Sequence, residues 1–107
     1  MASAAQVLAW RLRPGRLEDF IKIAGRADKI LKKFGATTRT LNNVVAGDQA
    51  GTALYIIECT DMKAFGALQD RMQTDQEWQA FIREVYSDPN PTADLVGSSL
   101  YTEVPVG

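Results

Sequence analysis

Two residue types limit the chemistry that this chain can perform. Its 107 residues include no histidine, and Cys59 is the only cysteine. A Ser-His-Asp or Cys-His arrangement therefore cannot form, and no histidine is present to hold haem or zinc. A lone cysteine also excludes an internal disulfide and a structural Cys/His zinc site. We therefore expect a protein without a cofactor or a tightly bound transition metal, in which Cys59 is a small buried side chain.

The sequence also gives no sign of a nucleotide, nucleic acid or membrane partner. Gly47 and Gly51 flank a predicted hairpin turn and open no helix, so they do not form a phosphate loop. Lys plus Arg number 12 and Asp plus Glu number 13, and the net charge of -1 favours no binding to nucleic acid. No apolar stretch approaches the roughly 20 residues of a membrane helix. Residues 1–10 lack the basic start of a signal peptide. We expect a cytoplasmic protein.

A strand and a helix are predicted in the first third of the chain. Residues 6–13 alternate with period two, which indicates a strand with Trp10 on its apolar face. A Pro-Gly pair ends this strand. From Leu17 to Phe34 apolar residues recur every three or four positions, which is typical of an amphipathic helix. Gly35 follows at a position that suits the left-handed end of a helix.

The middle of the chain predicts a hairpin. Residues 37–46 and 52–60 are rich in β-branched side chains, and 47–51 form a glycine-flanked loop between them. In the second strand the run Leu54-Tyr55-Ile56-Ile57 is apolar on both faces. A sheet with helices on one side leaves its other face in water. The second apolar face therefore has to be covered by something else.

A broken helix and a last strand complete the chain. Asp61 suits the N-cap of a helix. Thr74 and Glu77 have the spacing of a capping box, so we expect the helix to break near Thr74 and restart. Residues 87–91 are a loop, and 93–104 supply the last strand. The order β-α-β-β-α-β predicts an α+β, ferredoxin-like single domain over residues 1–107, with a four-stranded antiparallel sheet and helices on one face.

This organisation resembles the dimeric α/β-barrel superfamily, in particular its NIPSNAP-like and antibiotic-biosynthesis-monooxygenase-like branches. The resemblance covers Val7 to Val104. It rests on the element order, the two-sided strand, and the segment Asp75-Gln76-Glu77-Trp78-Gln79-Ala80-Phe81. It implies a ferredoxin-like fold that forms a dimeric α/β barrel through its sheets, but it implies no particular activity. The absence of histidine separates the chain from the haem-degrading branch, whose axial ligand is a histidine.

The resemblance also implies a place for a ligand. Cofactor-independent members hold a substrate between sheet and helices with Asn, Trp, Tyr and Arg side chains. The corresponding candidates in this sequence are Trp10, Asn43, Tyr55 and Trp78. If Ala46 pairs with Thr52, Asn43 lies opposite Tyr55, although a slip of one residue would move Asn43 to the other face. The alternative is that the tryptophans are core residues and that Asn43 is an ordinary edge-strand residue.

The apolar second face predicts a homodimer joined through the sheets. Its candidate interface residues are Val7, Ala9, Arg11, Leu54 and Ile56. Arginine forks on this face could pair with Glu58 or Glu103 and fix the register of two subunits. Alternatively, Arg11 and Arg13 are rim charges in water, which contribute little to stability.

Two functions remain open on these observations. The first is a non-catalytic homodimer that binds a small hydrophobic molecule or a partner. The second is a cofactor-independent monooxygenase or isomerase acting on a hydrophobic, aromatic small molecule, with Asn43 or Tyr55 as hydrogen-bond donors. The catalytic alternative lacks a strong general base, because Glu58 or Glu103 would need a pKa raised by burial. A pocket with converging polar groups would favour an enzyme, and a filled core would favour the other function.

Overall fold

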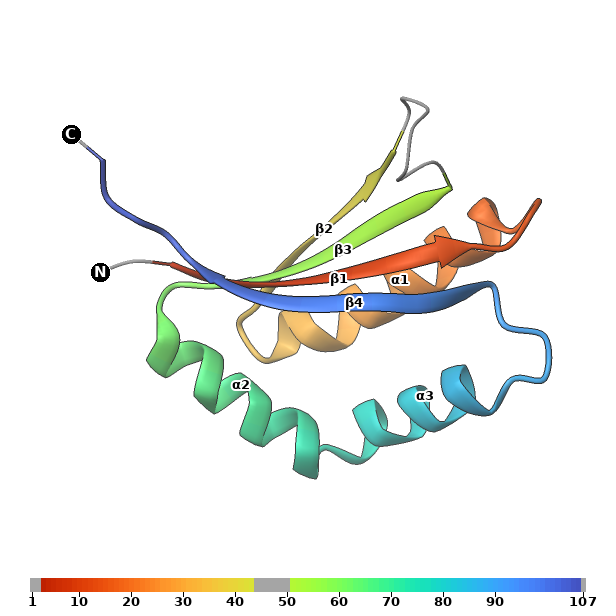
Figure 1. Ribbon diagram of the computed structural model, residues 1–107. Helices are drawn as coiled ribbons and strands as arrows, with labels where there is room; N and C mark the ends of the chain where they lie inside the picture. The colour runs from red at the N-terminus through yellow and green to blue at the C-terminus, as the bar shows by residue number, and fades with distance from the viewer. Residues whose placement is uncertain (1–2, 44–50, 107) are drawn as a thin grey trace.

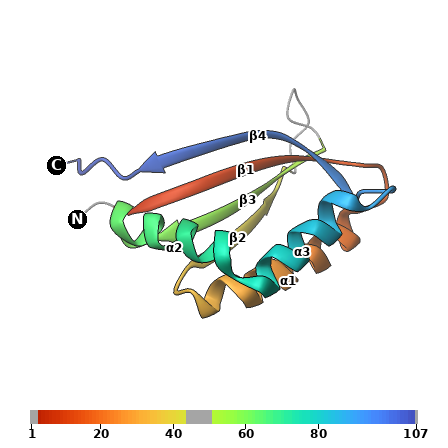
Figure 2. The same cartoon turned by 90° about the horizontal axis from the view of Figure 1, so that it is seen from below.

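The computed structural model describes residues 3–43 and 51–106. These residues form a four-stranded antiparallel sheet, in the order β2-β3-β1-β4, with three helices on one face of it (Figures 1 and 2). This arrangement confirms the predicted ferredoxin-like α+β fold. The elements are β1 (Ala4–Leu12), α1 (Leu17–Lys33), β2 (Thr37–Asn42), β3 (Thr52–Cys59), α2 (Met62–Thr74), α3 (Gln76–Ser87) and β4 (Ala93–Thr102). None of the helices in this part of the chain is both long enough and apolar enough to cross a membrane.

Helix α1 follows the sequence pattern at both its apolar face and its end. Phe20, Ala24, Ala27, Ile30 and Leu31 are buried against the sheet and the other helices. The helix is closed by two backbone hydrogen bonds, in which the N–H of Gly35 donates to Lys32 and the N–H of Ala36 donates to Leu31. Gly35 has a φ of 86°, which a residue with a Cβ adopts only at a cost. This geometry is a Schellman motif, as the glycine predicted.

The second helical region breaks where the sequence predicts, but a different residue caps the restart. Helix α2 includes Thr74, whose hydroxyl donates back to the carbonyl of Asp70 at 3.1 Å. Asp75 is the N-cap of α3, and its carboxylate accepts from the N–H of Trp78 at 2.8 Å. The Thr74–Glu77 capping box is therefore wrong. Thr74 is still helical, so its side chain points back along α2 and cannot reach the first turn of α3.

Asp75 rather than Thr74 should therefore carry the stability of this junction. Replacing Asp75 with alanine removes the acceptor for Trp78 N–H, and it should lower the free energy of unfolding by about 1 kcal/mol. Thr74→Ala is the matched control, because it removes only a hydroxyl bond to the preceding turn. Urea denaturation of both variants measures the difference. Equal midpoints for Asp75→Ala and the parent protein would contradict the cap seen here.

The hairpin register differs from the prediction by three residues. Thr40 lies opposite Tyr55, and the N–H of Asn43 donates to the carbonyl of Thr52 at 3.1 Å. Asn43 is therefore opposite Thr52, and an odd shift assigns it to the face away from Tyr55. The predicted Asn43–Tyr55 pairing is wrong because β2 ends at Asn42, which leaves a longer connection than a five-residue loop. Ala46 and residues 47–50 of the predicted loop lie outside the described residues.

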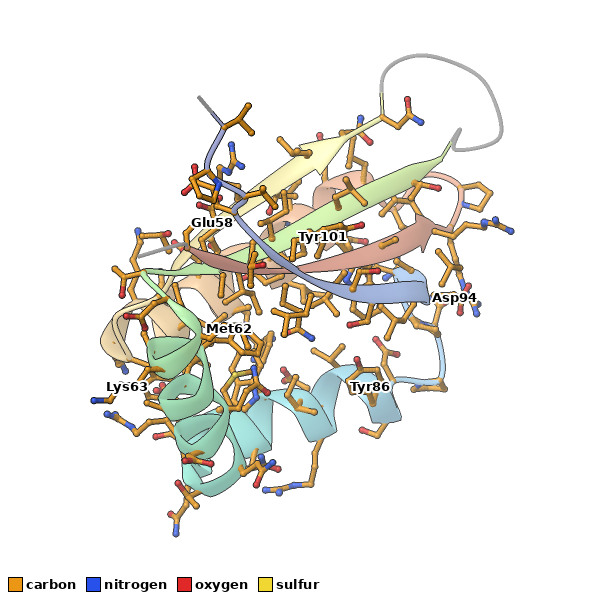
Figure 3. The ribbon with its side chains drawn as sticks, turned by 60° about the vertical axis from the view of Figure 1, so that its left-hand side comes forward. Glu58, Met62, Lys63, Tyr86, Asp94 and Tyr101 are labelled. Carbon is orange, nitrogen blue, oxygen red and sulfur yellow. The ribbon has the colours of Figure 1, made fainter. Side chains whose placement is uncertain are left out.

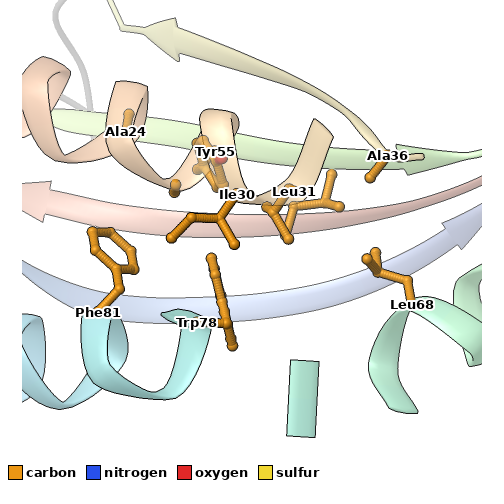
Figure 4. Packing of buried hydrophobic residues seen from close by; sticks show 10 residues of the cluster. Ala24, Ile30, Leu31, Ala36, Tyr55, Leu68, Trp78 and Phe81 are labelled. Atoms are coloured by element: carbon orange, nitrogen blue, oxygen red, sulfur yellow. The ribbon is translucent and has the colours of Figure 1, made fainter. Parts of the chain in front are cut away.

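The main core lies between the sheet and the helices. Figure 4 shows Ile30 and Leu31 of α1 facing Trp78 and Phe81 of α3, with Leu68 of α2 beside them. On β3, Tyr55 and Ile57 belong to this core. Cys59, predicted to be a small core side chain, packs against the core at the end of β3 and is partly buried. Burial raises the pKa of its thiol, with a smaller contribution from the negative charge of Asp61.

Candidate functional site: a pocket between sheet and helices

A cavity of about 520 Å³ lies between the helix-facing side of the sheet and the three helices. This volume is within the range of small-molecule sites. Trp10, Tyr55 and Trp78 line it, so the structure brings together three of the four residues predicted to form a pocket. Asn43 is not among the lining residues, as its position opposite Thr52 requires.

Trp10 is half-buried and lies between two other aromatic rings at one end of the pocket. Its ring centroid lies 6.1 Å from that of Phe20 at the start of α1 and 6.4 Å from that of Tyr86 near the end of α3. Such separations are typical of attractive aromatic pairs. Figure 3 shows Tyr86 on α3 and Asp94 at the start of β4, both at this end of the molecule. The first strand and helix of the chain and the distant helix α3 therefore supply aromatic walls to one place.

Trp78 lies deeper, where the pocket meets the core. It follows the Asp75 cap in the first turn of α3, and only 7% of its surface is exposed. Its ring packs against that of Phe81, with the centroids 5.5 Å apart. Both interpretations made from the sequence therefore apply, because Trp78 is a core residue and also lines the pocket.

Tyr55 presents its ring to the middle of the pocket and has an unusual hydroxyl. The side chain is buried, and no residue in the described part of the chain forms a well-aligned hydrogen bond with this oxygen. The neighbouring Thr38 hydroxyl instead donates to the Asp28 carboxylate at 2.5 Å. Burial raises the pKa of Tyr55 to about 12, the Asp28 charge adds to the rise, and the Thr38 hydroxyl opposes it. At neutral pH the group is a protonated donor and cannot act as a base.

Amide groups lie at the other end of the pocket. Gln6 of β1 donates through Nε2 to the Ser98 hydroxyl of β4 at 3.2 Å. Gln69 of α2 donates to the sulfur of Met72 at 3.8 Å. Gln6, Gln69 and Met72 line the cavity, whereas Ser98 does not. Both glutamines donate through the amide nitrogen, so their amide oxygens are the groups that could accept from a ligand.

The sequence interpretation missed several lining residues. Phe20 and Tyr86 belong to the apolar stripes of their helices, and the stripe of α3 could have been extended from Ile82 by four positions to reach Tyr86. Asp88 and Asp94 could not have been found in this way, because Asp88 belongs to the connection after α3 and Asp94 to the start of β4. Within residues 3–43 and 51–106, no three His, Cys, Asp or Glu side chains lie together as metal ligands.

The predicted interface residues lie on the sheet face away from the helices. Val7 is opposite Ile56 and Ala9 is opposite Leu54 on the paired strands β1 and β3. Neighbouring side chains already bury Ile56, whereas Leu54 is half-buried. Glu58 pairs with Arg39 of β2 at 2.9 Å within the same chain, so Arg11 is not its partner here. Arg11 is exposed beside Asp94 in the register of β1 and β4.

Comparison with solved structures gives full-length matches at low sequence identity. A NIPSNAP domain protein from Burkholderia xenovorans matches with a TM-score of 0.70 and 18% identity, over 96% of this chain and 94% of that one. A NIPSNAP family protein from Agrobacterium tumefaciens matches with 0.70 and 13%, over 97% and 93%. The fold is that of the NIPSNAP proteins. The likeness confirms the fold that the sequence resemblance implied.

Monooxygenase-like proteins share this fold as well. A variant of SnoaB, a cofactor-independent oxygenase from Streptomyces nogalater, matches with a TM-score of 0.68 and 13% identity, over 97% of this chain and 95% of that one. No protein-family model matches the sequence, and no curated protein does. At these identities the likeness to NIPSNAP and monooxygenase-like structures concerns the fold, and it specifies no function.

Proposed function

We propose that this protein is a small-molecule-binding homodimer whose ligand is flat and largely apolar. The observation that carries the proposal is the cavity of about 520 Å³, with Trp10, Tyr55 and Trp78 in its walls. A filled core would leave no such space, and ligand sites are concave, mostly apolar and supplied with a few polar groups. Gln6 and Gln69 supply such groups here.

The binding can be measured without a label, because both tryptophans of the chain line the pocket. A neutral naphthalene derivative such as 2-naphthalenemethanol should change the intrinsic fluorescence in a saturable way. Ala24→Leu should weaken this binding by about tenfold or more, because Ala24 lines the pocket and the added carbons occupy it. Thermal unfolding should show that the variant remains folded.

Ala67→Leu is the matched control, since Ala67 is exposed on α2 and does not line the pocket. It adds the same atoms and should leave the affinity unchanged. Equal affinities for the parent protein and Ala24→Leu would place the probe elsewhere. No saturable binding by the parent protein at millimolar probe would contradict the proposal.

A cofactor-independent oxygenase or isomerase is the second candidate. It is supported by the shared fold of the oxygenase SnoaB. It would require the protonated Tyr55 hydroxyl, which lies beside Thr38 and Asp28, to turn towards the substrate and donate to a developing oxyanion. The general base is the difficulty, because neither Glu58 nor Glu103 lines the pocket and Glu58 is paired with Arg39. Oxygen uptake with a dihydroxynaphthalene, abolished in Tyr55→Phe, would favour the enzyme over simple binding.

The homodimer is proposed on the face of the sheet that carries Val7, Ala9, Leu54 and Ile56. No helix of the described residues covers this face (Figure 2). A two-fold contact would bury both copies of the face at once. We also propose a cytoplasmic location, supported by the free thiol of Cys59, since such thiols are kept reduced there.

A further inference from the structure

The walls of the pocket carry negative charge and no positive charge. Asp88 lines it at the end that holds Trp10 and Tyr86, and none of the described lining residues is a lysine or an arginine. Asp94 borders this end as well, but its position opposite Arg11 directs its carboxylate to the sheet face away from the helices. An apolar cavity with an acidic group at one end should discriminate among ligands by the sign of their charge.

Asp88 is the carboxylate that remains available. It follows the last residue of α3 as the C-cap, and one of its oxygens accepts from the N–H of Asn90 at 2.8 Å. It forms no ion pair within residues 3–43 and 51–106. Helix α3 has no basic residue in its last turn, so the negative end of its dipole adds to the charge of Asp88.

Arg13 and Arg16 have partners of their own, and Arg11 lies beside Asp94 on the sheet face away from the helices. Arg13 holds Asp94 with two hydrogen bonds of 3.2 and 3.1 Å, and this contact keeps the pKa of Asp94 low. Arg16 donates to Asp19 at 2.8 Å and to the carbonyl of Asn90 at 3.2 Å. Asp94 is therefore largely neutralised, which leaves Asp88 as the unpaired charge at this end of the pocket.

Aromatic rings surround the same place. Trp10, Phe20 and Tyr86 form one connected group from β1, α1 and α3. The faces of such rings attract cations, tryptophan most strongly, and a carboxylate beside them strengthens the attraction. The carboxylate and the aromatic rings therefore point to the same kind of ligand group, a cation.

We propose that the ligand carries a positively charged amine at the end held by Asp88, Trp10 and Tyr86, joined to a flat apolar body that runs towards Trp78. This inference rests on the proposed binding function. It adds the charge of the ligand and the direction in which it lies.

Three probes with one apolar body test it. They are 2-naphthylmethylamine, 2-naphthalenemethanol and 2-naphthoate, which at neutral pH are a cation, a neutral alcohol and an anion. Affinities from tryptophan fluorescence and calorimetry should favour the cation over the alcohol by about tenfold. The anion should bind more weakly than the alcohol.

Asp88→Asn should remove most of the preference for the cation and leave the affinity for the alcohol unchanged. Asparagine keeps an oxygen that can accept from Asn90, so the loop should be retained. Asp70→Asn is the control, because it removes one exposed carboxylate from α2, away from the pocket. It should preserve the preference.

The outcomes test the amine ligand separately from the proposed small-molecule binding. Equal binding of the cation and the alcohol, tighter binding of the anion, or a cation preference that survives in Asp88→Asn would each overturn the amine ligand and leave the pocket intact. If none of the three probes binds the parent protein, the small-molecule function fails, and the amine ligand fails with it.

Discussion

Leu54→Lys should convert the proposed homodimer into monomers. Leu54 lies on the uncovered face of the sheet, opposite Ala9, and is half-buried in a single chain. A second copy would complete its burial and would leave the lysine in a dry contact. The loss of one important interface side chain costs about 2 kcal/mol of association free energy. Two-fold symmetry places the substitution twice, so the dissociation constant should rise by roughly a thousandfold.

Sedimentation equilibrium at micromolar concentration measures this effect. The parent protein should sediment at twice the 11.8 kDa of one chain, and the variant at 11.8 kDa. Ile56→Lys is a poorer test, because Ile56 is 7% exposed within one chain and a lysine there would also destabilise the fold. Ile21→Lys is the matched control, since Ile21 is a 53% exposed apolar residue on α1. A parent protein that sediments as a single chain would contradict the dimer.

The sequence predicted best where a hydrophobic period met a clear end signal. In α1 the three-to-four spacing selects Phe20, Ala24 and Leu31 for burial, and only glycine fits the left-handed position at 35. In β3 the run from Leu54 to Ile57 correctly indicated a strand with two apolar faces. These features are local, so they can be deduced without knowing what the rest of the chain does.

The wrong predictions concern positions at which neighbouring residues are equally suitable for one structural role. Thr74 and Asp75 are both good N-cap residues, and the end of α2 decided between them. The register of β2 depends on where a loop begins, which β-branched composition does not specify. Asp88 and Asp94 were invisible for a different reason, since they border the pocket only because β4 pairs with β1.

Trp78→Ala should cause the largest loss of stability among single substitutions in the pocket. Trp78 is only 7% exposed and packs on Phe81 within the main core. Truncating a buried tryptophan costs about 3–5 kcal/mol through lost burial and the cavity left behind. For a chain of this length that corresponds to a fall of roughly 12 °C or more in Tm. Calorimetry of the unliganded protein measures it.

Trp10→Ala is the informative comparison, because Trp10 is only half-buried and lies at the aromatic end of the pocket. It should lose roughly half as much stability, since less apolar surface is removed from the interior, and yet it should weaken binding of the naphthalene probes more than Trp78→Phe does. Trp78→Phe keeps a ring against Phe81 and should remain folded. Trp10→Ala could instead be less stable than Trp78→Ala, with probe affinity dependent on Trp78 alone. That result would mean that Trp10 supports the fold and that the ligand lies deeper in the pocket, away from Trp10. Because stability and affinity are measured separately, the pair distinguishes a tryptophan that holds the core together from one that meets the ligand.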